Sequence, residues 1–148
     1  MKLTIREVAD KDIYKIKQLA ADASEHGHLL VQRAIDDWAS KVNVFDMSGE
    51  ALLGVFENEK CIAICGLNID PYAPGCTTGR LRRLYVLPGH QRKGIGKALV
   101  QTVLKHAKPY YEKGRLYTDN QQAARFYESI GFVRIDEDKA THSIKIID

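Results

Sequence analysis

Apolar residues recur along the chain with two different periods. Apolar and polar side chains alternate over residues 3–8, which predicts a short strand because neighbouring strand residues face opposite sides. Over 13–23 the apolar residues recur every three or four positions and predict an amphipathic helix with Asp10 as its N-cap. The same spacing over 31–38 predicts a second helix.

The remaining elements follow without an internal repeat or a linker. Apolar runs at 51–57 and 60–70 flank a tight turn at Asn58 and Glu59, which is typical of a hairpin. The patterns that follow predict, in order, a strand at 79–87, a helix at 94–107, a strand at 115–118, a helix at 121–130 and two strands. We expect one domain over residues 1–148.

The strand at 79–87 has an irregular pattern. Leu81 and Leu84 lie three positions apart, so a regular strand would place them on opposite faces. One extra residue between them, a β-bulge, would bury both side chains. The alternative is a strand buried on both faces. We favour the bulge, which would end pairing with a neighbouring strand and open a slot.

Composition and charge exclude several classes of protein. Apolar residues make up 45% of the chain, too many for a disordered protein. The net charge of +3 allows an anionic ligand but lacks the dense basic stripe of a nucleic-acid-binding protein. No apolar stretch approaches the ~20 residues that span a bilayer. We expect a cytoplasmic protein that binds neither nucleic acid nor membrane.

The chain has three cysteines, an odd number that argues against a disulfide framework. Cys61 and Cys65 lie in an apolar run and are expected to be small buried residues. They do not form a C-x-x-C pair, so we expect no metal site.

The turn at 88–97 joins a strand to a helix and predicts an anion site. Its glycines allow backbone N–H groups to approach a ligand, and the first N–H groups of a helix lack internal partners. Arg92 and Lys93 add positive charge. Ile95 stands where a Walker A loop needs lysine, and Leu99 stands where a dinucleotide fingerprint needs its third glycine. A glycine-rich turn with solvated basic residues is the simpler alternative.

Two motifs resemble those of the GNAT superfamily of N-acetyltransferases. The first is Leu84-Tyr-Val-Leu-Pro88 followed by Gln91-Arg-Lys-Gly-Ile-Gly96, which resembles the acetyl-CoA-binding pattern Q/R-x-x-G-x-G/A. The second, from Asn120 to Phe132, matches N-x-x-A-x-x-F-Y-x-x-x-G-F at every defined position. The order of elements resembles that family over the whole chain.

The resemblance implies an α+β fold, an α/β/α sandwich of about four helices around a mixed, mostly antiparallel sheet. A bulged strand would split that sheet around a slot for acetyl-CoA. By resemblance, the turn would hold the pyrophosphate and the strand backbone would pair with the pantetheine arm. The expected cofactor-binding residues are Leu84, Tyr85, Val86, Gln91, Arg92, Lys93, Gly94, Ile95, Gly96, Lys97, Asn120 and Tyr127.

The resemblance also implies direct transfer of an acetyl group to a neutral amine. Tyr127 is the expected catalytic residue, a general acid that protonates the departing thiolate; the alternative is an ordinary core aromatic. Asn120 either contacts the cofactor or caps the helix that follows it. A covalent route through Cys76 is disfavoured because no neighbour in the sequence would activate its thiol. A CoA-binding sensor or an inactive member of the fold is the alternative function.

The acceptor is expected to be a small-molecule or peptide amine, bound near residues 26–38 and 70–78, and a homodimer is a further expectation from the family. Arg80 stands where many members carry a glutamate base. A lysine-like amine costs about 4 kcal/mol to neutralise near pH 7.4, but an α-amine costs less than about 1 kcal/mol. We therefore expect either a low-pKa amine or proton removal through water, with Asp70 as a candidate base. Arg80, Arg82 and Arg83 either bind a carboxylate on the acceptor or form salt bridges with protein acids.

Overall fold

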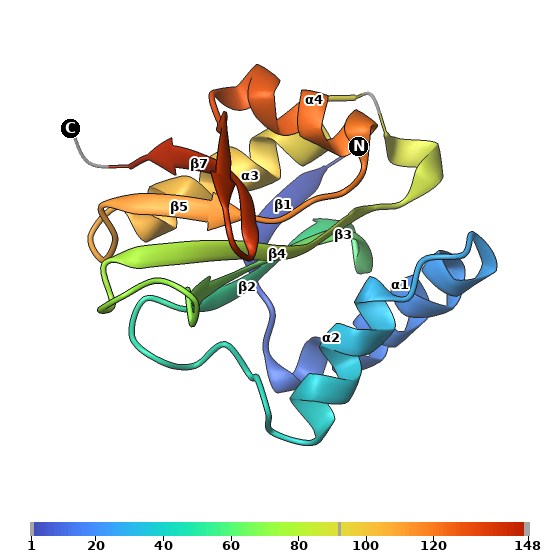
Figure 1. The fold of residues 1–148 in the computed structure, drawn as a ribbon. Coiled ribbons are helices and arrows are strands. Elements are labelled where there is room, and N and C mark those ends of the chain that lie inside the picture. Colours follow the sequence, from blue (N-terminus) through green and yellow to red (C-terminus); the bar gives the residue numbers. More distant parts are fainter. Residues whose placement is uncertain (1, 92, 147–148) are drawn as a thin grey trace.

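A seven-stranded sheet in the order β1-β2-β3-β4-β5-β7-β6 forms the centre of the molecule (Figure 1). The computed structural model describes residues 2–91 and 93–146. Neighbouring strands are antiparallel except for β4 and β5, which are parallel. The elements are β1 (Leu3–Glu7), α1 (Ile13–Glu25), α2 (Leu30–Ala39), β2 (Ala51–Glu57), β3 (Lys60–Ile69), β4 (Thr78–Val86), α3 (Ile95–Ala107), β5 (Lys113–Leu116), α4 (Gln121–Ile130), β6 (Val133–Glu137) and β7 (Ala140–Lys145).

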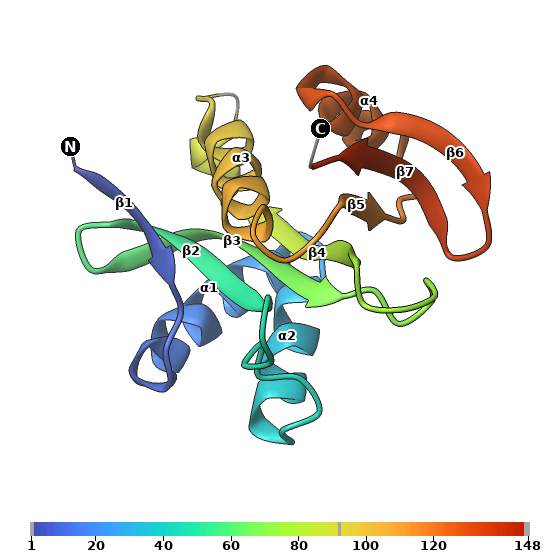
Figure 2. The same ribbon diagram turned by 90° about the vertical axis from the view of Figure 1, so that its left-hand side faces the viewer.

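Helices cover both faces of the sheet. Figure 2 shows α1 and α2 on one face and α3 and α4 on the other. Almost every residue of β2 and β3 is buried, because these strands are covered on both sides. The predicted α/β/α sandwich and its element order are confirmed. Among the described residues, no helix combines the length and the apolar character needed to cross a membrane.

Two details at the ends of elements differ from the sequence-based expectation. The strand expected at 115–118 forms two residues earlier, at Lys113–Leu116, because Lys113 and Gly114 pair with the start of β4. Asp10 is not the N-cap of α1. A short 3-10 turn precedes the helix, so Asp12 stands at its start, and Asp10 instead accepts a hydrogen bond from the indole of Trp38 at 2.7 Å.

The Asp12 carboxylate ties the first strand to the first helix. It is buried, accepts two hydrogen bonds from Arg6 at 2.8 and 2.9 Å, and accepts a third from the backbone N–H of Ala9 at 2.9 Å. These interactions favour the ionised form. The hydrogen bonds from Arg6, which outweigh burial, lower the pKa of Asp12 from its ordinary 3.8 to about 2.

A stability measurement tests the role of Asp12. Since its pKa is lower in the folded than in the unfolded chain, its stabilisation is complete above pH 4 and is lost as the pH falls toward 2. Asp12→Asn should reduce the free energy of unfolding at pH 7 by about 1–2 kcal/mol, with the difference from wild type shrinking between pH 4 and 2. Urea denaturation at several pH values measures this, with the exposed Asp46→Asn as control. A constant difference across this range would contradict the assignment.

Candidate functional site

The sheet opens between β4 and β5. These strands pair only at Thr78 with Lys113, Gly79 with Gly114 and Arg80 with Arg115. Beyond Arg80, β4 continues to Val86, whereas β5 ends at Leu116. Among the residues that the structure describes, the backbone of β4 from 81 to 86 therefore has no strand partner on the β5 side, and the C-terminal strands turn away from it (Figure 2). We call this opening the β4–β5 split.

A bulge in β4 lies at the start of the split, as the sequence pattern predicts. Ile64 pairs with Tyr85 and Gly66 pairs with Arg82, so Cys65 alone faces two residues of β4, Arg83 and Leu84. Arg83 has a φ of +63°, an uncommon conformation for a residue with a side chain. Leu81 is fully buried and Leu84 is half-buried, so the bulge reconciles their positions only in part.

The backbone after the bulge points its polar groups into the split. The N–H of Leu87 donates across to Ile62 of β3 at 2.8 Å. Because N–H and C=O directions alternate along a strand, those of Val86 point the other way, toward the side where β5 has ended. The carbonyl of Val86 accepts a hydrogen bond from the side chain of Gln91 at 2.9 Å. The Gln91 side chain thus fastens the following turn to the end of β4.

The turn into α3 presents a helix N-terminus beside the end of β4. Gly94 is the N-cap and has a φ of +78°, which glycine adopts without strain. A Cβ added at Gly94 or at Gly89 would meet no atom within 4 Å, so both glycines border open space. The first N–H groups of α3 have no carbonyl partner within the helix and carry the positive end of its dipole. The turn can therefore bind an anion.

The residues expected to contact the cofactor surround this turn and the split. At Gly96, α3 lies close to its neighbours: an added Cβ would lie 3.3 Å from Phe126 and 3.5 Å from Val86. Of the other expected residues, Lys93 and Lys97 are exposed, whereas Ile95 and Tyr85 are buried in the core. Arg92 lies outside the described residues.

The second motif, from Asn120 to Phe132, forms helix α4 and its two ends. The side chain of Asn120 accepts a hydrogen bond from the backbone of Ala123 at 2.9 Å, so it caps α4. Gly131 ends the helix with a φ of +125°. Phe126 and Tyr127 diverge as expected: Phe126 contacts the start of α3, whereas Tyr127 points into the core and packs edge-on against Phe132.

Tyr127 is a buried phenol. It is 9% exposed, and its pKa lies well above the ordinary value of 10, first because of burial and second because of the neighbouring Cys65 thiol. Cys65 is itself fully buried, which raises its pKa to about 12. Both groups are therefore protonated at neutral pH, so the Tyr127 hydroxyl can donate a proton.

On the α2 face of the split, the Asp70 carboxylate is fully occupied by contacts with other residues of the protein. Its side chain is fully buried, accepts a hydrogen bond from Nε of Arg115 at 2.9 Å, and lies 3.6 Å from Nη1 of Arg80. It also accepts the backbone N–H of Tyr72 at 2.8 Å. These contacts disfavour Asp70 as the base that the sequence suggested. Sequence reasoning missed Arg115, although an arginine in a short apolar strand was the available signal.

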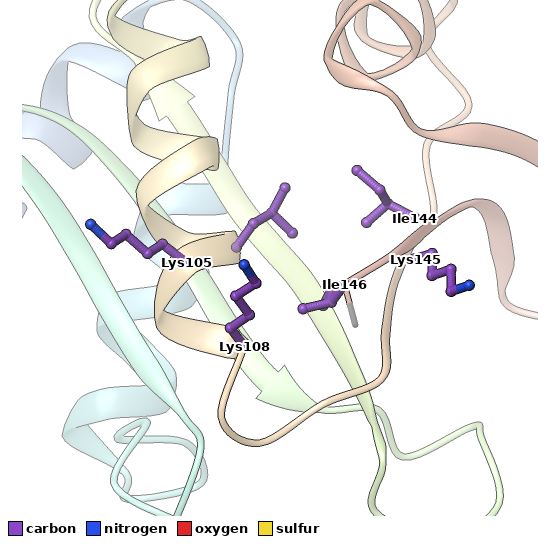
Figure 3. Close-up of a pocket in the computed structure, with 6 residues that line it drawn as sticks. Lys105, Lys108, Ile144, Lys145 and Ile146 are labelled. Atoms are coloured by element: carbon purple, nitrogen blue, oxygen red, sulfur yellow. The ribbon is translucent and has the colours of Figure 1, made fainter. Parts of the chain in front are cut away.

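A separate pocket of about 220 Å³ lies on the opposite face, between the C-terminal half of α3 and the end of β7 (Figure 3). Leu104, Ile144 and Ile146 line it together with Lys105, Lys108 and Lys145. Neither predicted motif contributes to its lining. We therefore place the candidate site at the split and not at this pocket.

Comparisons with known proteins show the family of the chain. The family model described as "Acetyltransferase (GNAT) family" matches residues 11–132. The chain is 32% identical to a candidate acetyltransferase from Exiguobacterium sp. 255-15, covering 98% of this chain and 94% of the other, with a TM-score of 0.85. No protein with curated annotation is significantly similar in sequence.

Two more distant structures share the fold alone. The first is the PaiA N-acetyltransferase from Thermoplasma acidophilum in complex with coenzyme A, with 23% identity, coverage of 98% and 99%, and a TM-score of 0.75. The second is YncA from Salmonella typhimurium, solved with its cofactor acetyl-CoA, with 16% identity, coverage of 99% and 95%, and a TM-score of 0.73. The family model spans most of the chain, and a structure that is 32% identical covers nearly all of it: this protein belongs to the GNAT family of acetyltransferases.

Proposed function

We propose that this protein transfers an acetyl group from acetyl-CoA to a primary amine by direct attack of the amine on the thioester. The observation that carries the proposal is that the N-terminal turn of α3 lies beside the unpaired edge of β4, where a Cβ at Gly96 would lie 3.5 Å from Val86 and 3.3 Å from Phe126 of the second motif. Two proteins of the same fold, PaiA and YncA, are described with coenzyme A and acetyl-CoA.

The residues at the split fit the parts of acetyl-CoA. The pyrophosphate is an anion, and the N–H groups from Gly94 to Lys97 with the exposed Lys93 can hold it. The pantetheine arm carries two amides, which can pair with the backbone of Leu84 to Val86 as an added strand would. Acetyl-CoA supplies the activated acetyl group. Gln91 and Asn120 support the site as a brace and a helix cap.

Tyr127 is the group we assign as general acid. The phenol is protonated at neutral pH, as proton donation to a departing thiolate requires, and the burial that raises its pKa also makes it a weaker acid. Burial among Phe126, Phe132 and the sheet holds the ring in one orientation. A tyrosine that only packs in the core would be equally buried. Kinetic measurements must therefore distinguish a general acid from a packing residue.

The amine must lose its proton without a carboxylate at position 80. Arg80 stays protonated and Asp70 is enclosed by Arg80 and Arg115, so neither can act as base. An α-amine with a pKa near 8 is substantially neutral at physiological pH and needs little help. We infer that the acceptor is an amine of low pKa.

Two alternatives remain to be separated by experiment. A CoA-binding sensor would bind acetyl-CoA without turnover on any amine. A covalent route would need an activated nucleophile; Cys76 is exposed in the loop before β4, and no described side chain hydrogen-bonds to it.

The unpaired state of all three cysteines is consistent with the cytoplasm, our expected compartment.

The α3 turn is tested by placing a negative charge in it. Gly94→Glu should abolish the rise in melting temperature that acetyl-CoA gives the wild type, because a carboxylate at the helix N-terminus repels the pyrophosphate and fills the open space beside it. Differential scanning fluorimetry with and without acetyl-CoA measures the effect. Ser24→Glu adds the same charge on an exposed position of α1 and should keep the shift. An undiminished shift in Gly94→Glu would place the cofactor elsewhere.

The role of Tyr127 is tested by removing only its hydroxyl. Tyr127→Phe should lower kcat by about 100-fold while leaving acetyl-CoA binding intact, since a general acid contributes to that extent. The control is Tyr111→Phe: Tyr111 is also buried, but it donates to Gly49 and packs near Gly79, at the other end of β4. A kcat close to wild type in Tyr127→Phe would make this tyrosine a packing residue.

The absence of a protein base is tested by the pH dependence of the rate. The ascending limb of kcat/KM should follow the pKa of the acceptor itself, near 8 for a peptide α-amine and near 10 for a lysine side chain. Initial rates across pH 6 to 10.5 with one acceptor of each kind measure this. A limb with the same midpoint for both acceptors would reveal a base in the protein.

A further inference from the structure

Four arginines gather on the α2 side of the split. We define the arginine cluster as Arg80, Arg82 and Arg83 of β4 with Arg115 of β5. Three of them have acidic partners. Arg115 donates to Asp70 and to Glu137, Arg80 lies 3.6 Å from the same Asp70, and Arg83 lies 3.2 Å from Asp37 of α2. These contacts support the salt-bridge alternative for Arg80 and Arg83.

Arg82 differs from the other three. It is half-buried, and no described carboxylate forms an ion pair with it. Its pKa lies below the ordinary value, first because of burial and then because of the positive charges of Arg83 and Arg80. The cluster thus holds four guanidinium groups against three carboxylates, an excess of one positive charge in a poorly solvated place.

Unused hydrogen-bond donors accompany this excess charge. Nη1 of Arg80, Nε of Arg83 and Nη2 of Arg115 are buried and have no hydrogen-bond partner among the described residues. A buried donor without an acceptor costs free energy, so such groups are typically satisfied by a ligand or water. An anion beside Arg82 would supply the missing negative charge and acceptor atoms for the Arg82 guanidinium.

The cluster lies where the acceptor is expected to enter. Arg82 is two residues beyond the last β4–β5 pair, at the start of the split. Asp37 of α2 pairs with Arg83 of the cluster. Tyr72, in the loop between β3 and β4, stacks on Arg80, with 5.0 Å between the centre of its ring and the Arg80 guanidinium carbon. These are the two segments that we expect to form the acceptor pocket.

We propose that Arg82, assisted by Nη1 of Arg80, binds a carboxylate on the acceptor, so that the substrate is an amine that also carries a carboxylate, such as a short peptide. The inference rests on the proposed function and names the substrate class of the same site. A guanidinium binds a carboxylate through paired hydrogen bonds. The uncompensated positive charge of Arg82 suits the single negative charge of a carboxylate.

A matched pair of acceptors tests the proposal. Alanyl-alanine and alanyl-alanine amide share an α-amine and differ in the C-terminal carboxylate. Wild type should acetylate the acid with a kcat/KM roughly 10- to 100-fold higher than the amide, the range that charge-assisted hydrogen bonds give. Arg82→Gln should remove this preference, mainly by raising KM for the acid. Lys105→Gln, which removes a charge at the pocket of Figure 3, should keep it.

Calorimetric binding of both dipeptides to the CoA-loaded wild type gives a second readout that needs no variant and no turnover. Tighter binding of the acid supports the carboxylate site even if no acetylation occurs, in which case the proposed transferase activity fails and the site stands. Equal turnover of acid and amide overturns the carboxylate site and leaves the transferase activity intact. Equal binding of the two also overturns the carboxylate site and does not bear on the transferase activity. A preference for the acid that survives in Arg82→Gln also overturns it.

Discussion

The buried carboxylate of Asp70 holds the two halves of the sheet together. Arg80 and Arg115 are the last residue pair of the β4–β5 seam, so two positive side chains stand opposite each other on neighbouring strands. Like charges in that position repel. Asp70, at the end of β3, lies within 4 Å of both guanidinium groups and neutralises this repulsion where the strands begin to separate. Asp70 thus stabilises the seam at the point where the split begins.

This arrangement also explains the departure from the family pattern at position 80. A glutamate there would face Asp70, and two buried carboxylates would repel each other. The chain instead has an arginine whose guanidinium lies against Asp70 at the seam. In the function that we propose, the chemistry would then depend on an amine that deprotonates easily, and Arg82 would serve recognition. On that proposal, one substitution links the stability of the sheet to the choice of substrate.

Much of the fold could be predicted from the sequence because its signals are local. The phase conflict between Leu81 and Leu84 predicted the bulge, and the two motifs placed the turn and α4. The features that the sequence did not predict are contacts between residues far apart in the chain. Asp70 and Arg115 are 45 residues apart, and no local pattern shows that they meet. Asp12 replaces Asp10 at the start of α1 because Arg6 of β1 lies within reach of it, a contact that helical spacing does not encode.

The β4–β5 seam is only three residue pairs long, and it joins two units that are otherwise built from sequence neighbours. Strands β1 to β4 form an antiparallel sheet in chain order apart from the inserted helices, and β6 with β7 is a hairpin that carries β5 at its edge. Short seams between such units open more readily than their interiors. The C-terminal unit should therefore open as a separate cooperative unit in native-state hydrogen exchange. A ligand that fills the split spans both units, so its binding would slow that opening and merge the two units into one.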